Sequence, residues 1–266
     1  MSGKPFLVGR IGANEEFSMR TFECNISNNY GKALKQLNIC AGFFPIENEI
    51  TRGKAFLKIM KETLANVDLL GLVNTPLEKY FINKCANANA KKSQLLDYYP
   101  WNSDNYHWTK ALKGKKVLIV YPFTETIENQ YNNYRTSIFN NEDILPEFKL
   151  ITYKSVQTSA LEKDDRFSTW EEALNYMHDE IKKIDYDIAI IGCGSYGLPL
   201  ASMLKNDGKQ AIHMGGSVQV LFGIIGKRWE DKTEYRQLYK YLNRTTYLNK
   251  NEQLKNQSLI EGGIYW

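Results

Sequence analysis

The sequence predicts an α/β protein built on a mostly parallel sheet with helices on both faces. Short apolar stretches of strand length recur along the chain, at residues 6–12, 67–73, 114–121, 148–156, 187–191 and 209–214. Helix-starting signals stand between most of them, and glycines follow the first strand and the last two. This alternation is typical of parallel sheets, because parallel neighbours need a crossover connection that is usually a helix.

In the first half of the chain, helix signals follow the two expected strands. Asn14 is placed to cap the helix after the first strand. A helix is expected over residues 53–65, and another begins at Thr75 and Pro76, because Thr caps helices well and Pro suits the first helical position. Residues 86–110 are polar and aromatic and have no clear assignment, although they could carry contacts to an acceptor.

The middle of the chain contains the clearest strand, residues 114–121. It ends at a polar loop that includes Glu125, and ligands of open α/β sheets sit at such strand ends. After the strand at 148–156, a Ser-x-x-Glu capping box beginning at Ser168 predicts a helix that reaches about residue 184.

The most informative segment is a strand–turn–helix–strand unit over residues 186–229. Its first turn has the spacing Gly-x-Gly-x-x-Gly and consists of Gly192, Cys193, Gly194, Ser195, Tyr196 and Gly197. Pro199 lies in the first turn of the following helix, and Gly208 is placed to end it. A second turn, Gly215 and Gly216, breaks the second strand.

Such a turn favours an anionic ligand, because glycines let the backbone approach closely and a helix N-terminus offers unpaired N–H groups. A dinucleotide site would need an acidic residue at the end of the second strand, where this chain has His213. The pattern therefore indicates a phosphate or a sugar rather than a nicotinamide. The alternative is that these glycines only allow the helix and strand to pack tightly.

Composition is that of an ordinary soluble protein and predicts a single domain over residues 1–266. The chain has 266 residues, of which 43% are hydrophobic and 24% charged. It contains no apolar stretch of membrane-spanning length, and residues 1–5 begin no signal peptide. We therefore expect a cytoplasmic protein, with at most peripheral contact with the inner face of the membrane.

Cysteine spacing argues against a secreted, disulfide-stabilised protein, and the net charge argues against a nucleic-acid-binding protein. The four cysteines lie far apart and form no CxxC pair, so we expect them to be reduced and mostly buried. A net charge of +4 is too small to predict a nucleic-acid partner.

The exit of the first strand combines a cation, a glycine turn and a carboxylate in Arg10, Gly12, Asn14 and Glu15. This is a plausible place for a diphosphate and a divalent cation, with Glu15 as a metal ligand or catalytic carboxylate. The alternative is that Glu15, in the first turn of a helix, merely complements the helix dipole.

These residues also carry a family resemblance. Residues 10–15, Arg-Ile-Gly-Ala-Asn-Glu, resemble the Arg-aromatic-Gly-Asp-Gly-Glu start of the bacterial GT-D-fold glycosyltransferases, and the unit ending at residues 210–216 is similar to the C-terminal region of that family. Residues 194–201, 222–229 and 261–266 resemble a bacterial group found among surface-polysaccharide genes.

The resemblance implies a Rossmann-like, GT-D-like fold and a glycosyltransferase of surface or capsular polysaccharide biosynthesis. Such an enzyme moves a sugar from a nucleotide-sugar donor, typically UDP-linked, to a glycan or lipid-linked glycan acceptor with the help of Mn²⁺ or Mg²⁺. In the family an Asp-x-Glu pair serves metal and donor, whereas here the first position is Ala13 and the second is Glu15. Either Glu15 and the donor phosphates hold the metal, or Arg10, Lys227 and helix N–H groups neutralise the diphosphate without one.

The predicted site lies between the turns after the first strand and after residues 187–191. Its donor-binding residues would be Arg10, Gly12, Asn14, Gly192, Gly194, Ser195, Tyr196, Gly197, Gly215, Gly216, Gln219 and Lys227, and Ser217 could also contact the donor. The candidate bases are His213, Glu125 and Glu47, besides Glu15. His213 is attractive because an imidazole titrates near neutrality, although it could be purely structural.

Two other functions stay open. One is another Rossmann-like nucleotide-sugar enzyme, and the other is a non-catalytic nucleotide- or sugar-binding component of a polysaccharide assembly complex. The replacement of the family's Asp by Ala13 keeps the second of these open.

Overall fold

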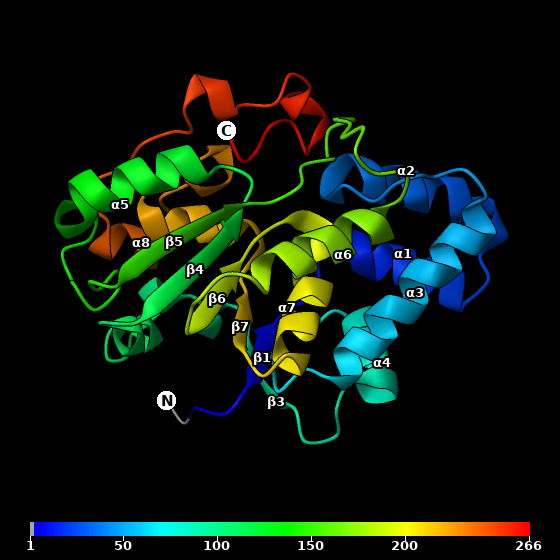
Figure 1. Cartoon of the computed structure of the whole chain (residues 1–266), viewed down its shortest axis with the longest axis horizontal. Helices are drawn as coiled ribbons and strands as arrows, with labels where there is room; N and C mark the ends of the chain where they lie inside the picture. The colour runs from blue at the N-terminus through cyan, green and yellow to red at the C-terminus, as the bar shows by residue number, and fades with distance from the viewer. Residues whose placement is uncertain (1–2) are drawn as a thin grey trace.

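A seven-stranded, entirely parallel sheet forms the centre of the molecule, in the order β3-β2-β1-β7-β6-β4-β5 (Figure 1). The computed structural model describes residues 3–266. Met1 and Ser2, the first residues of the segment that we expect to begin no signal peptide, lie outside the described residues. The strands are β1 (Phe6–Gly9), β2 (Leu69–Leu72), β3 (Lys91–Gln94), β4 (Lys116–Tyr121), β5 (Lys149–Lys154), β6 (Ile188–Ile191) and β7 (Gln210–His213). The predicted α/β, Rossmann-like fold is confirmed.

Helices cover both faces of the sheet, as expected. One face packs against α1 (Ala13–Glu23), α2 (Tyr30–Ala41), α3 (Glu49–Ala65), α4 (Pro76–Cys85), α6 (Trp170–Ile181) and α7 (Gly197–Asn206). The other packs against α5 (Thr124–Ile138), the 3₁₀ helix η6 (Gly215–Phe222) and α8 (Arg236–Tyr241).

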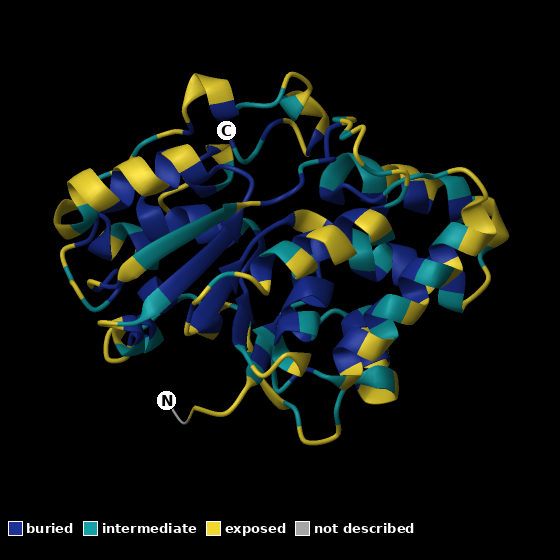
Figure 2. Ribbon diagram, viewed as in Figure 1, coloured by how far each residue is buried: buried dark blue, intermediate teal, exposed yellow. Residues whose placement is uncertain are grey.

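Two hydrophobic cores therefore lie on opposite sides of the strands. In β4, Leu118 and Val120 belong to the first core, whereas Val117 and Ile119 belong to the second. This alternation follows from the two-residue period of a strand. Figure 2 shows the consequence: the central strands are buried, and exposed residues gather on the outer surfaces of the helices.

Of the three helix caps that the sequence predicts, two differ in detail in the structure and one agrees. The N-cap of α1 is Gly12, and Asn14 lies inside the first turn without capping it. The capping box of α6 is shifted by one residue, because Thr169 accepts a hydrogen bond from the backbone N–H of Glu172, while the Ser168 N–H donates to the Glu172 carboxylate. The cap of α4 is Thr75, as predicted.

Residues 86–110, which had no clear assignment, contribute the edge strand β3. Three 3₁₀ helices follow it, η2 (Leu96–Tyr98), η3 (Pro100–Asn102) and η4 (Trp108–Leu112). The strand was not recognised because its residues, Lys-Lys-Ser-Gln, are polar and almost all exposed. An edge strand with one open side needs no continuous apolar run, and exposed lysines are common there.

The segment after β7 adds no strand to the sheet but covers its second face and its carboxyl edge. It contains η6, η7 (Lys227–Trp229), α8, η8 (Lys250–Glu252) and η9 (Gln257–Leu259), and Figure 1 shows it running over the top of the sheet to the C-terminus. Within residues 3–266, no helix combines the length and apolar character that crossing a membrane requires.

Candidate functional site

A cavity of about 450 Å³ lies along the carboxyl edge of the sheet. Residues at or just after the end of every strand line it: Arg10, Val73, Leu95, Tyr121, Ser155, Gly192 and His213. Open parallel sheets bind ligands at this edge, and the volume lies within the usual range for small-molecule sites. The two predicted turns, far apart in sequence, therefore meet at one cavity.

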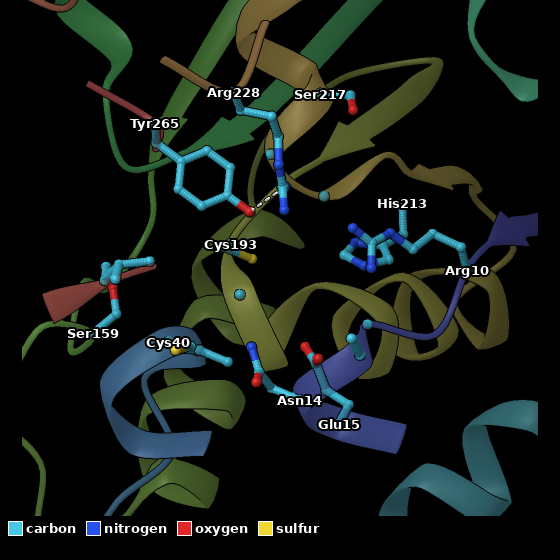
Figure 3. Close-up of a pocket in the computed structure, with 18 of the residues that line it drawn as sticks. Arg10, Asn14, Glu15, Cys40, Ser159, Cys193, His213, Ser217, Arg228 and Tyr265 are labelled. Atoms are coloured by element: carbon cyan, nitrogen blue, oxygen red, sulfur yellow. Dashed lines mark hydrogen bonds between the residues drawn. The ribbon is translucent and has the colours of Figure 1, made fainter. Parts of the chain in front are cut away.

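The turn after β1 places a carboxylate directly over a glycine. A Cβ atom at Gly12 would lie 2.0 Å from Oε2 of Glu15, so only glycine lets this carboxylate fold back over the start of α1. Asn14 and Glu15 both extend from α1 toward the cavity (Figure 3). The Oδ1 atom of Asn14 accepts a hydrogen bond from Nε2 of Gln36 at 2.8 Å.

Arg10 brings a positive charge into the cavity. Its Nη1 donates to the backbone oxygen of Ile11 at 3.3 Å, whereas its buried Nε has no hydrogen-bond partner among residues 3–266. Burial alone would lower the pKa of Arg10, but Tyr99 and Glu15 outweigh it and raise the pKa, so the guanidinium stays charged. A buried donor without an acceptor is costly, and an anionic ligand would supply the missing acceptor.

Glu15 is the carboxylate best placed for chemistry. Burial raises its pKa, an effect that Arg10 only partly offsets. Two neighbouring carboxylates that line the cavity already have protein partners. Glu16 accepts a hydrogen bond from Thr75, and Glu261 forms an ion pair with Arg228. A carboxylate with a raised pKa is a better proton acceptor than an ordinary one.

His213 lies at the end of β7 with its ring against Gly197. A Cβ at position 197 would lie 2.4 Å from Nδ1 of His213, and this nitrogen is buried without a partner among the described residues. Burial and the charge of Arg10 lower the pKa of His213 to about 3. The expectation that this imidazole titrates near neutrality is therefore wrong. It lines the cavity as a neutral ring, which is a weak base.

The second cation of the cavity is Arg228, one residue after the predicted Lys227. Its Nη1 donates to the hydroxyl of Tyr265 at 2.9 Å (Figure 3). Its Nη2 lies 3.2 Å from Oε2 of Glu261. Lys227 is exposed and lines a different, smaller cavity. Neighbouring residues of a 3₁₀ helix point in different directions, so the pair of basic residues alone did not show which one enters the site.

The glycine-rich turn after β6 contributes to the cavity through Gly192, Gly194 and Tyr196. Its glycines are also required for packing. A Cβ at Gly192 would lie 2.3 Å from the oxygen of Gly215, and one at Gly194, where φ is +57°, would lie 2.6 Å from the oxygen of Ala41.

Two side chains of this turn are structural. The Ser195 hydroxyl, outside the cavity lining, donates to the oxygen of Ala41 at 2.7 Å and accepts from Nε1 of Trp170 at 3.0 Å. The Tyr196 hydroxyl lies 2.9 Å from Oγ1 of Thr158, and its ring stacks on Trp170. The predicted contact of Ser195 with a ligand is therefore not supported by its position, and the polar end of Tyr196 is already occupied.

The second glycine turn, after β7, lies directly against site residues. Gly215, with φ of +59°, packs against Arg10, whose Nη2 would be 3.3 Å from a Cβ there. A Cβ at Gly216 would lie 2.2 Å from the ring of Tyr265. Both glycines and Ser217 line the cavity, as expected.

Gln219 does not line the cavity but holds the C-terminal segment in place. It is fully buried, its Oε1 accepts from the Tyr121 hydroxyl at 2.8 Å, and its Nε2 donates to the backbone oxygen of Tyr265 at 3.1 Å. The side chain has no polar atom to spare for a donor sugar. Its predicted role is replaced by an architectural one.

Glu125 and Glu47 are both exposed and lie outside the cavity lining. The Glu125 carboxylate accepts a hydrogen bond from Asn251 at 2.7 Å. The carboxylate of Glu252 accepts the backbone N–H groups of Glu125 and Thr126 at 2.9 Å each, so it fills the end of α5 where a ligand anion was conceivable.

The donor set does not fit a protein-built metal site. Among the residues that the structure describes, no group of three or more His, Cys, Asp or Glu side chains could hold an ion. The charges that act on Glu15 are the guanidinium of Arg10 and the carboxylate of Glu261, and Glu261 is itself paired with Arg228. Cys40 and Cys193 also line the cavity, but burial raises both thiol pKa values, that of Cys40 to about 11, so neither offers a thiolate.

Comparisons with known proteins give a single distant likeness to report. No protein-family model matches the sequence, and no curated protein matches it. A solved structure titled as a selenomethionine-substituted domain of unknown function 1792 aligns with 96% of this chain and 90% of its own, at a TM-score of 0.42 and 12% identity. A likeness at this level supports no functional inference, so function is argued below from the cavity.

Proposed function

We propose that this protein is a glycosyltransferase that moves a sugar from a nucleotide-sugar donor, UDP-linked, to a glycan acceptor of a bacterial surface polysaccharide. The observation that carries the proposal is the cavity at the carboxyl edge of the sheet, where Nε of Arg10 has no acceptor among residues 3–266 and Glu15 has a raised pKa. The choice of sugar transfer over other reactions of anionic substrates rests on the resemblance of residues 10–15 to the GT-D family.

The donor diphosphate would lie against the guanidinium of Arg10. Arginine suits this role because its planar donors match phosphate oxygens and it stays charged. Arg228, which also lines the cavity, would add a second positive charge, although Glu261 already neutralises part of it. These two arginines would carry the charge of the leaving diphosphate, and no step requires a metal ion held by the protein.

Glu15 would act as the general base. In a direct displacement the acceptor oxygen attacks the anomeric carbon, its proton passes to the Glu15 carboxylate, and the bond from that carbon to the phosphate oxygen breaks. The electron pair of that bond leaves with the nucleoside diphosphate. Positioned general bases typically accelerate such steps by about 10²- to 10⁴-fold.

The first test is a thermal-shift screen of the purified protein with UDP, GDP, CMP and their sugar conjugates, each with Mn²⁺ or with EDTA. We expect one nucleotide-sugar class to stabilise the protein selectively and most of the shift to persist in EDTA. Release of the nucleotide from that donor, measured in a coupled assay with and without added glycans, then tests turnover.

The outcomes separate the candidate functions. Absence of stabilisation by every nucleotide would contradict the donor site. Selective binding without nucleotide release under any condition would favour the non-catalytic binding component. A shift that vanishes in EDTA would show that the ligand brings a metal ion to Glu15, contrary to the role given to the arginines.

A further inference from the structure

A second cavity, of about 250 Å³, lies beside the first. It is formed between the 3₁₀ helix η7 and the segment from residue 247 to residue 266, and its lining includes Lys227, Tyr247, Gln257, Ser258 and Trp266. Trp266 lines both cavities. The two cavities therefore meet at this residue.

Two polar atoms in this lining have unmet hydrogen-bonding capacity. Oε1 of Gln257 and Nε1 of Trp266 are both buried and have no partner within residues 3–266. Trp266 as a whole is 8% exposed. Buried polar atoms in native proteins nearly always have partners, so each of these two lining residues has a hydrogen bond that a ligand can supply.

The two atoms are opposite in character, since Oε1 of Gln257 accepts a hydrogen bond and Nε1–H of Trp266 donates one. A hydroxyl group is both donor and acceptor, so it complements this pair. The rest of the lining suits a sugar as well. Tyr247 is 57% exposed and offers an aromatic surface, while Lys227 and Ser258 add polar groups. Aromatic rings with polar tips suit ligands that combine apolar and polar surfaces.

We propose that the smaller cavity is a subsite for a hexose unit of the glycan acceptor, whose hydroxyls donate to Gln257 Oε1 and accept from Trp266 Nε1–H. This inference rests on the proposed glycosyltransferase function and adds where the acceptor binds. Lys227, expected from the sequence at the donor phosphates, is thereby assigned to the acceptor side. The acceptor glycan then extends from this subsite past Trp266 into the donor cavity.

Trp266 is held in a defined position between the two cavities. Its ring makes edge contacts with those of Phe123 and Tyr265, whose centroids lie 5.8 and 6.0 Å away. Phe123 and Tyr265 both line the donor cavity. These ring contacts fix the orientation of the indole, so its N–H is a preorganised donor.

The test uses the full chain and measures binding of methyl glycosides of glucose, galactose, N-acetylglucosamine and glucuronic acid by saturation-transfer NMR at millimolar concentrations. We expect the wild-type protein to bind at least one of them. Gln257→Met keeps an unbranched side chain but removes the acceptor, and we expect it to weaken that binding by about tenfold while UDP affinity stays unchanged.

Trp266→Phe removes the indole N–H and serves as the second variant, with the same expected loss. Gln257→Met should also unfold at the same or a higher temperature than wild type, because it removes a buried acceptor without a partner. Failure of the wild-type protein to bind any of the glycosides, or unchanged binding in both variants, would overturn the subsite. Glycoside binding that depends on Gln257 in a protein that binds no nucleotide would instead retain the subsite and reject the donor site.

Discussion

The turn after β1 and the turn after β6 both contain glycines at the carboxyl edge of the sheet, yet they use them differently. At the first, Gly12 makes room for the carboxylate of a functional candidate, Glu15. At the second, Gly194 and Gly197 make room for the backbone of Ala41 and the ring of His213. Glycine permits close approach in each case, and the approaching group decides whether a turn shapes a ligand site or a packing contact.

The difference matters because the second turn has the more familiar pattern. Gly-x-Gly-x-x-Gly after a strand indicated a phosphate site, whereas the shorter Arg-Ile-Gly-Ala-Asn-Glu was a weak signal on its own. In the structure the weaker signal carries the cation with an unmet donor, Arg10, and the carboxylate with a raised pKa. The stronger pattern supplies backbone walls to the cavity, and its Ser195 ties the turn itself to α2.

The largest expected effect is on the packing role of the second turn. We predict that Gly194→Ala destabilises the protein by about 2–6 kcal/mol, from left-handed strain and a collision with the Ala41 oxygen. Gly208→Ala is the matched control, since Gly208 has φ of +83° and open space around its Cβ position, and strain alone should cost about 1 kcal/mol. Urea denaturation measures both; equal losses in the two variants would show that the contact with Ala41 is unimportant.

The chemical role of the first turn is tested next by Glu15→Gln. We expect the transfer rate to fall by about two to three orders of magnitude, because the amide cannot accept the acceptor's proton. Folding should not suffer. The raised pKa means that the folded state binds the proton of Glu15 more tightly than the unfolded state does, so ionisation of Glu15 costs stability above its ordinary pKa of 4.5.

Glu15→Gln should therefore be at least as stable as wild type at pH 7, and the difference should shrink as the pH falls toward 4.5 and be absent below it. Rate assays and urea denaturation at two pH values measure the two effects. A variant that keeps full activity, or one that unfolds readily at pH 7, would contradict the assignment of Glu15.

The charge at the first turn gives the third prediction. Arg10→Met should weaken binding of the nucleotide diphosphate by about 10- to 100-fold, because it removes hydrogen bonds to a charged group. Lys227→Met removes a cation that lies outside the donor cavity and should leave UDP affinity unchanged. Isothermal titration with UDP compares the variants, and equal losses would mean that the attraction is a general effect of positive charge.

The smallest expected effect concerns His213, the residue at which the two turns meet. Its pKa of about 3 lies below the ordinary 6.5. As the pH falls below 6.5, the unfolded state therefore binds a proton that the folded state does not bind. Wild type should lose about 1.3 kcal/mol from this source between pH 7 and pH 5.5. His213→Gln should lack this component, which urea denaturation at the two pH values detects; identical pH dependence in both proteins would place the imidazole in a more solvated setting.

Much of the fold could be predicted from the sequence because its central strands are apolar on both faces. Residues 187–191 and 114–121 stand out for this reason, and they form β6 and β4. The edge strand β3 could not be found in this way, since its side chains are polar and its place depends on pairing with β2. The order of the strands likewise depends on contacts between residues about 200 positions apart.

The site was predictable only where a residue's role follows from its position at a strand end. Arg10, Glu15, Gly192 and Gly215 meet this condition and line the cavity. Arg228 and Tyr265 come from the segment beyond the last strand, whose path over the sheet no periodic pattern reveals. Gln219 and Glu125 look equally available in the sequence, but tertiary hydrogen bonds with Tyr121 and Asn251 occupy them.

The place of β1 between β2 and β7 has a consequence for how the molecule is made. Its pairing with β2, such as Val8 with Leu69, forms early in synthesis, whereas its pairing with β7, such as Phe6 with Gln210, waits for most of the chain. Until then one side of β1 is an open strand edge, which invites pairing with other chains. The wall between Arg10 and His213 exists only when β7 is paired with β1, so the ligand cavity requires residues from nearly the whole length of the chain.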